Sequence, residues 1–233
     1  MSSVHIPYET QDIKWFEYEQ RWKIKCVELL NHYVASGVRN CTTVFDFGCG
    51  RGEFLNLLTG NGYKAEGGDF DLNCVKLSSR FAPSILLSDA ELDSFINGNA
   101  YDVVCAIHVL EHLRDPASAV ENFKKMTRRY LLLAVPNLQS TACICLRRSY
   151  QANEGHIFGW DYPHFENFLR MICHLDIIEM TGDTVPFTTK LSKVDVALEK
   201  LLGRSVIRKL ENGPLLRRFP YLSHSILALC KIN

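Results

Sequence analysis

VFDFGCGRG, at residues 44–52, is the stretch that decides the fold of this chain. An apolar run interrupted by one acid, Asp46, leads into three glycines at alternate positions, Gly48, Gly50 and Gly52. The apolar run predicts a parallel strand that is buried on both faces. Because glycine tolerates positive φ angles and has no Cβ, the turn after this strand lets the backbone approach a ligand closely. A helix after the turn would direct its N-terminal amides at that ligand.

Strand and helix patterns alternate on either side of this turn. Strands are predicted at residues 44–47, 63–68, 84–87, 101–107 and 130–135, and helices at residues 53–58, 72–80 and 116–128. Asp115 followed by proline predicts the start of the last of these helices. Such alternation predicts an α/β fold with a doubly wound, mostly parallel sheet whose ligand lies at the carboxyl ends of the strands.

The ends of the chain depart from this alternation. Residues 10–36 predict an aromatic-rich helix, and we expect residues 1–40 to form a helical cap on a domain that spans residues 41–233. A helix capped by Asp161 is expected to reach about residue 174, and a sixth strand follows at residues 175–180. Residues 186–222 read as an insertion with two short helices, near 194–202 and 206–210, before a last strand at 223–231. Pairing of the sixth and last strands predicts an antiparallel hairpin at the sheet edge.

Length and composition limit the classes of function. The chain has 233 residues, 47% of them hydrophobic, and a formal net charge of zero, so one domain with a large core is expected and nucleic-acid binding is not. No apolar run reaches the roughly 18 residues that span a bilayer, and the N-terminus lacks an apolar signal core. Nine cysteines without paired spacing predict reduced, buried thiols and a cytoplasmic location.

Two further acids suit an adenosine ligand. Asp69 closes the second predicted strand, 17 positions beyond Gly52, where a carboxylate can accept hydrogen bonds from both ribose hydroxyls. Asp89 follows the third strand, where a carboxylate can accept from an adenine amino group. Asp46 is expected to orient the amides of the glycine turn. The alternatives are a glycine pattern that serves only a tight turn, a helix cap at Asp69 and a plain loop acid at Asp89, and a dinucleotide is also compatible with this pattern.

Four motifs in this order resemble the class I S-adenosylmethionine-dependent methyltransferases. They are VFDFGCGRG at 44–52, AEGGDFD at 65–71, SDAE at 88–91 and YDVVCAIHVLEHLRDP at 101–116, and they are similar to the ubiquinone-pathway, type 11 and type 23 methyltransferase families. The resemblance implies a Rossmann-like fold that binds S-adenosylmethionine and releases S-adenosylhomocysteine. It also implies cofactor-binding roles for Gly48, Gly50, Gly52, Asp69, Phe70, Asp89, Ala90, Ile107 and His108.

Two histidines are candidates for the catalytic base that a hydroxyl acceptor needs. The resemblance places His108 just past the fourth strand, near the sulfonium, and His156 at the acceptor pocket. Glu111 and His112 are expected to pack and hydrogen-bond locally, and His164 to be structural. The alternative is a metal held by His156, Asp161 and His164, but this spacing fits no standard ligand set, so no metal is predicted.

The acceptor is predicted only by class. Aromatic residues of the cap, of the connection at residues 138–160 and of the helix after it suit a pocket for a small apolar or ring-bearing molecule. Packing alone explains any one of them. They are Trp15, Phe16, Tyr18, Trp22, Tyr150, Phe158, Trp160, Tyr162 and Phe165. The insertion at residues 186–222 is rich in Lys and Arg, which suits an acidic substrate or a peripheral membrane contact. The alternative is that these side chains only form a solvated helical face. We therefore expect methyl transfer to oxygen on a small molecule. The alternatives are a macromolecular acceptor (RNA or protein), a non-catalytic adenosine-binding protein and a dehydrogenase. The oligomeric state is not predicted.

Overall fold

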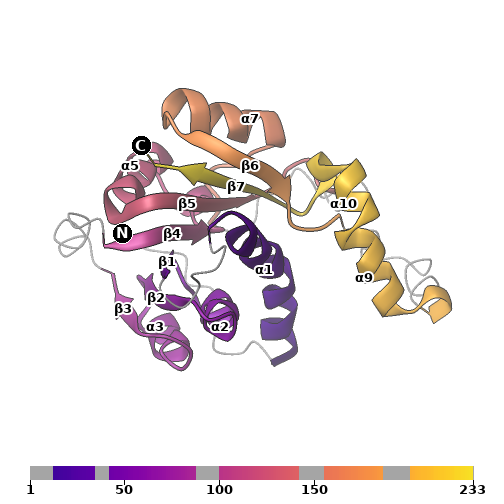
Figure 1. The fold of residues 1–233 in the computed structure, drawn as a ribbon, viewed down its shortest axis with the longest axis horizontal. Coiled ribbons are helices and arrows are strands. Elements are labelled where there is room, and N and C mark those ends of the chain that lie inside the picture. The colour runs from indigo at the N-terminus through magenta and orange to yellow at the C-terminus, as the bar shows by residue number, and fades with distance from the viewer. Residues whose placement is uncertain (1–12, 35–41, 88–99, 142–154, 186–199, 233) are drawn as a thin grey trace.

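A seven-stranded sheet in the order β3-β2-β1-β4-β5-β7-β6 forms the centre of the computed structural model, which describes residues 13–34, 42–87, 100–141, 155–185 and 200–232 (Figure 1). β7 is antiparallel to both of its neighbours, whereas the other pairs are parallel. The sheet confirms the predicted Rossmann-like α/β class with an antiparallel hairpin at one edge. Its strands are β1 Thr43–Phe47, β2 Lys64–Asp69, β3 Ser84–Leu86, β4 Tyr101–Ile107, β5 Thr127–Pro136, β6 Asp176–Gly182 and β7 Ser225–Lys231.

Helices cover both faces of this sheet (Figure 1). Within the described ranges, none of them is long and apolar enough to cross a membrane. The helices are α1 Ile13–Tyr33, α2 Glu53–Gly60, α3 Leu72–Ser78, α5 Pro116–Met126, α7 Tyr162–Asn167, α9 Arg204–Asn212 and α10 Pro214–Arg218. Shorter turns are η3 Leu110–His112, η4 Phe168–Ile172 and η5 Pro220–Leu222.

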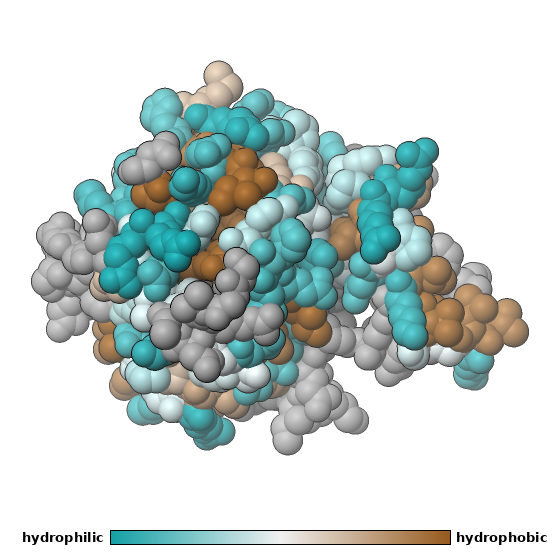
Figure 2. All heavy atoms as spheres, viewed as in Figure 1, coloured by the Kyte–Doolittle hydropathy of each residue, from teal (hydrophilic) through white to brown (hydrophobic). Residues whose placement is uncertain are grey.

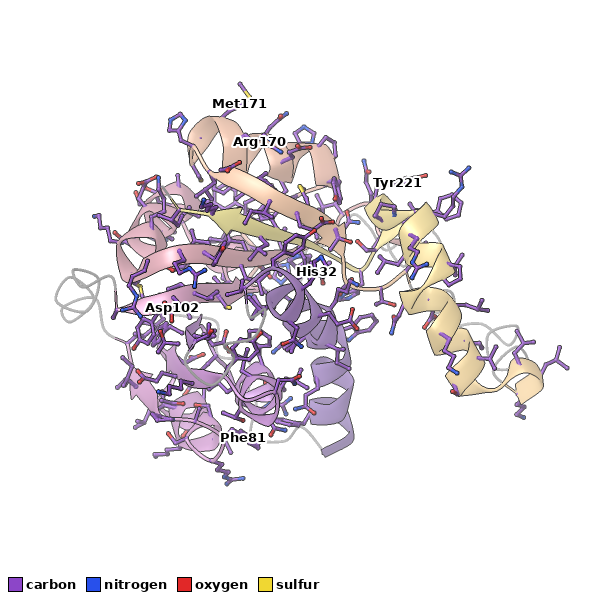
Figure 3. All side chains as sticks on the ribbon, in the orientation of Figure 1. His32, Phe81, Asp102, Arg170, Met171 and Tyr221 are labelled. Atoms are coloured by element: carbon purple, nitrogen blue, oxygen red, sulfur yellow. The ribbon has the colours of Figure 1, made fainter. Side chains whose placement is uncertain are left out.

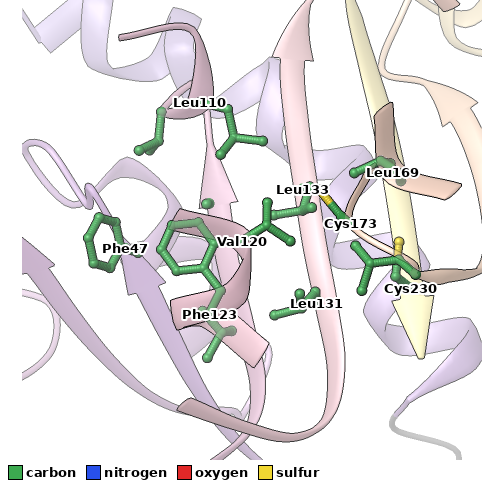
Figure 4. Close-up of a cluster of buried hydrophobic side chains, with 14 of the residues drawn as sticks. Phe47, Leu110, Val120, Phe123, Leu131, Leu133, Leu169, Cys173 and Cys230 are labelled. Atoms are coloured by element: carbon green, nitrogen blue, oxygen red, sulfur yellow. The ribbon is translucent and has the colours of Figure 1, made fainter. Parts of the chain in front are cut away.

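The core consists of two apolar layers, one on each face of the sheet. Because side chains alternate along a strand, Leu132 packs in the layer of α1 and α2, while Leu131 and Leu133 pack in the layer of α5 and α7. Figure 4 shows the second layer, where Phe123 of α5 lies against Phe47 with ring centroids 4.7 Å apart. Full burial of such a ring predicts that Phe123→Ala would cost about 3–5 kcal/mol.

Several element ends differ from the sequence-based prediction. Asp115 caps α5 by accepting a hydrogen bond from the Ser118 amide over 3.0 Å, as predicted. However, α5 ends at Met126 instead of 128, because β5 begins at Thr127, whose hydroxyl donates to the Asp102 carbonyl at 3.2 Å. Asp161 caps α7, but the helix widens into a π-turn from Phe168 onward instead of remaining α-helical to 174. Met171 points outward from this turn (Figure 3).

The C-terminal helices α9 and α10 form an arm that projects from the body of the molecule (Figure 1). Asn137 holds the base of this arm by donating from Nδ2 to the Tyr221 carbonyl over 2.8 Å. Figure 2 shows apolar atoms at the far end of the arm, where Leu201 is 80% exposed. The predicted helix at 206–210 is confirmed and is longer than expected, whereas most of 194–202 lies outside the described residues. The division of the chain at residue 40 and the insertion at 186–222 remain predictions.

Candidate active site

The glycine turn after β1 is held against the end of β2. The amides of Gly48 and Cys49 both donate to the Gly68 carbonyl, over 2.8 and 3.0 Å. Gly48, Gly50 and Gly52 have φ angles of 72°, 54° and 89°. These left-handed values explain why the sequence places glycine at these three positions, since a Cβ is strained there.

The three glycines face different surroundings. A Cβ at Gly48 would lie 2.6 Å from Val109, and one at Gly52 would lie 2.9 Å from the Ser78 backbone and 2.8 Å from Phe81 (labelled in Figure 3). By contrast, a Cβ at Gly50 would meet only a Glu53 carboxylate oxygen, at 3.8 Å. Packing inside the protein therefore requires glycine at positions 48 and 52, as do their φ angles. At Gly50, by contrast, the space that a Cβ would occupy is open. The cofactor contacts predicted for all three remain predictions.

Asp69 joins the second acid motif to the glycine turn. Its Oδ2 accepts from the Gly50 amide and its Oδ1 from the Asp71 amide, each over 2.9 Å. Burial raises the pKa of Asp69, and these two amides partly offset that rise. Each carboxylate oxygen keeps lone-pair capacity for a further donor, such as a ribose hydroxyl. Phe70, beside it, is 50% exposed and offers a ring face at the same edge. Asp89 and Ala90 lie outside the described residues.

A buried charged group ties α1 to the turn. Arg51 Nη2 lies 2.6 Å from Glu53 Oε1, Lys23 Nζ lies 3.7 Å from Glu53 Oε2, and Gln20 Nε2 donates to the Glu53 carbonyl over 3.1 Å. Asp46 is 3% exposed, and burial raises its pKa to about 7, while Lys23 acts in the opposite direction. The N-terminal helix thus closes over the glycine turn through ionic and polar contacts.

His108 follows β4 directly and has a φ angle of 57°, which is uncommon for a residue with a Cβ. Its Nε2 lies 2.8 Å from the Ser225 hydroxyl, and the same hydroxyl lies 3.1 Å from Nδ1 of His224. His224 Nδ1 lies 3.5 Å from Oδ2 of the buried Asp183. Burial lowers the pKa of His108 well below its usual value, and His224 adds to this effect. Both effects favour the neutral imidazole of His108, which lies at the end of a polar chain.

A small recess opens beside this chain. Its lining combines α1 with the ends of β4, β5 and β7: Trp22, Lys23, Cys26, Ile107, His108, Ala134, Ser225 and Leu227. Trp22 stacks on His224 with ring centroids 4.4 Å apart. Ile107 and His108 thus line one space with a cap aromatic, and the position near the sulfonium that the resemblance implies for them remains a prediction. Among the other predicted pocket aromatics, Trp160 and Phe165 are instead buried in the core with exposed fractions of 6% and 0%.

His156 belongs to a different group from His108. Its ring meets the His112 ring edge-on, with centroids 4.8 Å apart, and burial with the neighbouring His112 lowers its pKa. Glu111 lies beside them with 1% of its surface exposed. His164 Nδ1 lies 2.6 Å from Asp161 Oδ1, and the structural role expected of His164 remains a prediction.

Ser225, His224 and Asp183 did not emerge as candidates from the sequence. The signal for Ser225 and His224 is the polar triplet Ser223-His224-Ser225 directly before an apolar strand, which read simply as part of that strand. Because β7 runs antiparallel, Ser225 pairs with Pro136 and lies at the carboxyl end of the parallel strands. Only the strand order brings these residues to His108.

Comparison with known proteins places this geometry in a family. A family model described as a methyltransferase domain matches residues 25–179, so the chain belongs to the type 23 methyltransferase domain family. S-adenosylmethionine is the cofactor of this class. The open space at Gly50, the remaining acceptor capacity of Asp69 and the exposed ring of Phe70 fit such a nucleoside.

Solved structures share the fold at low sequence identity. A SAM-dependent methyltransferase from Archaeoglobus fulgidus is 19% identical with a TM-score of 0.60, over 94% of this chain and 100% of that one. Magnesium protoporphyrin IX methyltransferase from Synechocystis, with bound SAH, is 15% identical with a TM-score of 0.61, over 100% and 90%. The [4+2]-cyclase SpnF is 13% identical with a TM-score of 0.60, over 98% and 87%. No functionally curated protein matches the chain by sequence. Since one neighbour is named a cyclase, the shared fold does not define the acceptor.

Proposed function

We propose that this methyltransferase transfers the methyl group of S-adenosylmethionine to an oxygen atom of a small-molecule acceptor. The observation that carries the proposal is the position of His108, at the end of β4, in the lining of the recess and 2.8 Å from Ser225. A neutral imidazole there is suited to take the proton that a hydroxyl loses during methyl transfer.

The cofactor-binding roles follow from the turn and the strand ends. Asp69 would hold the ribose hydroxyls while its amide bonds keep the carboxylate fixed, and Phe70 would lie beside the adenine. Gly50 would pass beneath the ligand, with Gly48 and Gly52 shaping the turn and Asp46 supporting it. Asp89 and Ala90 would bind the adenine edge, as the motif order implies. Ile107 would lie near the reacting sulfur.

The bound cofactor supplies an activated methyl group, so the protein's own task is to orient the acceptor, exclude water and accept a proton. The Ser225 hydroxyl can donate to only one of its two histidine neighbours and accepts from the other, so the tautomers of His108 and His224 are coupled. A proton taken up on Nδ1 of His108 can therefore pass through Ser225 to His224. The resulting imidazolium would be stabilised by Asp183, 3.5 Å away.

The charge of the chain favours a small acceptor over a nucleic acid. The chain has no net charge, and the recess beside His108 is closed on one side by Trp22 and Lys23 of α1. His156, half-buried and with a lowered pKa, is the second candidate base.

Initial rates of S-adenosylhomocysteine formation with a panel of phenols, catechols and carboxylic acids test this proposal. We expect turnover with at least one hydroxyl or carboxyl acceptor, and a fall of roughly 10²–10⁴-fold in His108→Ala. His164→Ala, which removes an exposed imidazole, is the matched control and should match wild type. Methyl transfer confined to RNA or protein, or to nitrogen atoms, would contradict the proposal.

A further inference from the structure

A second cluster of ionisable side chains lies beyond His108, at the turn η3. The Glu111 carbonyl accepts hydrogen bonds from the amides of Ile157 and Phe158, over 2.7 and 3.1 Å. These bonds hold the segment around His156 against η3. They bring three potential metal ligands, Glu111, His112 and His156, to within 4.8 Å of one another.

Glu111 has the least satisfied side chain of the cluster. It is 1% exposed, and among the described residues neither of its carboxylate oxygens has a hydrogen-bond partner. A buried carboxyl group without partners is costly, and native proteins pair such groups or use them as metal ligands. Within the described ranges, the nearest ionisable nitrogen is Nε2 of His112, 4.0 Å from Glu111 Oε1, which is too long for a hydrogen bond.

His112 is oriented as a ligand by its other ring nitrogen. Nδ1 lies 3.1 Å from the Gly155 carbonyl, which can only accept, so the proton is on Nδ1. In the neutral imidazole with this tautomer, Nε2 presents a lone pair toward Glu111. An imidazole fixed by a backbone carbonyl in this way is a recurring arrangement at metal centres. Two electron-rich atoms thus face each other across a gap that a cation would bridge.

We propose that Glu111, His112 and His156 bind one divalent transition-metal ion, with zinc as the best match. Two imidazoles and one carboxylate are a ligand set that suits zinc, whereas calcium and magnesium prefer oxygen ligands alone. Ligands of one tetrahedral zinc ion lie about 3.4 Å apart, so small side-chain rotations complete the site. Three protein ligands leave one coordination position for water or an acceptor oxygen. The site does not depend on the acceptor chemistry proposed above.

Zinc binding by the chelator-treated full chain tests the site without an activity assay. We expect about one equivalent of Zn²⁺ by titration calorimetry, and binding at least tenfold weaker in both Glu111→Gln and His156→Ala. Glu111→Gln keeps the side-chain shape and removes the carboxylate ligand, and its metal-free form should melt no lower than wild type. His164→Ala, which removes the imidazole paired with Asp161, is the control and should bind zinc normally. With Co²⁺ as the probe, the absorption spectrum should lack a thiolate band, which separates this site from the cysteines.

Three results would overturn the site: no uptake of zinc by wild type, unchanged zinc affinity in either variant, or equal loss of zinc in His164→Ala. S-adenosylhomocysteine binding, measured on the same variants, should remain intact. Loss of zinc with retained nucleoside binding therefore separates this site from the cofactor site, and failure of one does not imply failure of the other.

Discussion

The amide of Gly50 donates a hydrogen bond to Oδ2 of Asp69 over 2.9 Å, so the turn after β1 and the acid that closes β2 form one unit. The carboxylate is thereby fixed before any ligand arrives. Fixed groups lose less conformational freedom on binding. Asp69 therefore supports the turn, and we propose that it also offers acceptor capacity to a ribose.

Replacement of Asp69 by alanine should remove most of the rise in melting temperature that S-adenosylhomocysteine causes through linkage. Two hydrogen bonds to a charged acceptor contribute about 1.5–3 kcal/mol each, so affinity should fall at least about 100-fold. Differential scanning fluorimetry with and without ligand measures this. Asp115→Ala removes the cap of α5, a hydrogen bond to the Ser118 amide, and should keep the full ligand-induced shift. An equal shift in Asp69→Ala and wild type would remove Asp69 from the cofactor site.

Alanine at Gly50 and at Gly52 should have opposite consequences. Gly52→Ala places a methyl group 2.9 Å from the Ser78 backbone, so the free energy of unfolding should fall by several kcal/mol. Gly50→Ala meets no close atom and should cost only about 1–2 kcal/mol for its left-handed φ angle. However, its methyl group would occupy the open side of the turn and weaken nucleoside binding. Urea unfolding and ligand titration of the two variants separate these effects, and similar profiles in both assays would contradict the assignment.

The pH dependence of turnover should reflect the buried imidazole of His108. Because burial holds its pKa well below the usual value of about 6.5, the neutral base already predominates at pH 7. We expect kcat/KM to be flat from about pH 6.5 upward and to fall only in more acidic solution. Ser225→Ala breaks the chain to His224 and should lower kcat more than it changes KM. A rate that still climbs steeply above pH 7 in wild type, with the climb abolished in His108→Ala, would contradict a lowered pKa.

Asp46 should make the protein without ligand less stable as pH rises from about 4 to about 7. Burial raises the pKa of Asp46 to about 7, so in this window the folded state binds a proton that the unfolded state has released. The stability it contributes is complete below pH 4 and is lost as pH rises through 7, by at most a few kcal/mol. Asp46→Asn should remove this slope. Chemical denaturation at a series of pH values measures the difference, and parallel curves for both proteins would show that Asp46 does not titrate in this way.

The parallel part of the fold could be predicted from the sequence because its signals are local. The strand at 101–107 is found at those residues, and the cap at Asp115 is present as its dipeptide with proline predicts. Element ends were less certain, as at Met126, where β5 begins directly after α5. The π-turn after Asn167 depends on packing of Leu169 and Cys173 into the core, which no local pattern records.

The part of the site that lies within sequence motifs could be predicted, whereas contacts between residues of distant strands could not. The glycine turn and Asp69 follow one another within a short stretch, and the structure brings them into contact. The chain from His108 through Ser225 to His224 joins residues more than 100 positions apart. Similarly, Glu111 and His112 read as local packing residues. They lie close to His156 because the backbone amides of residues 157 and 158 donate hydrogen bonds to the Glu111 carbonyl.

Titration calorimetry of wild-type protein with S-adenosylhomocysteine tests the central claim most directly. If the turn at Gly50 and the carboxylate of Asp69 hold the nucleoside, the titration should show saturable heat with about one site per chain. Folded protein that gives no binding heat at several temperatures, and no rise in melting temperature with the same ligand, would contradict the account.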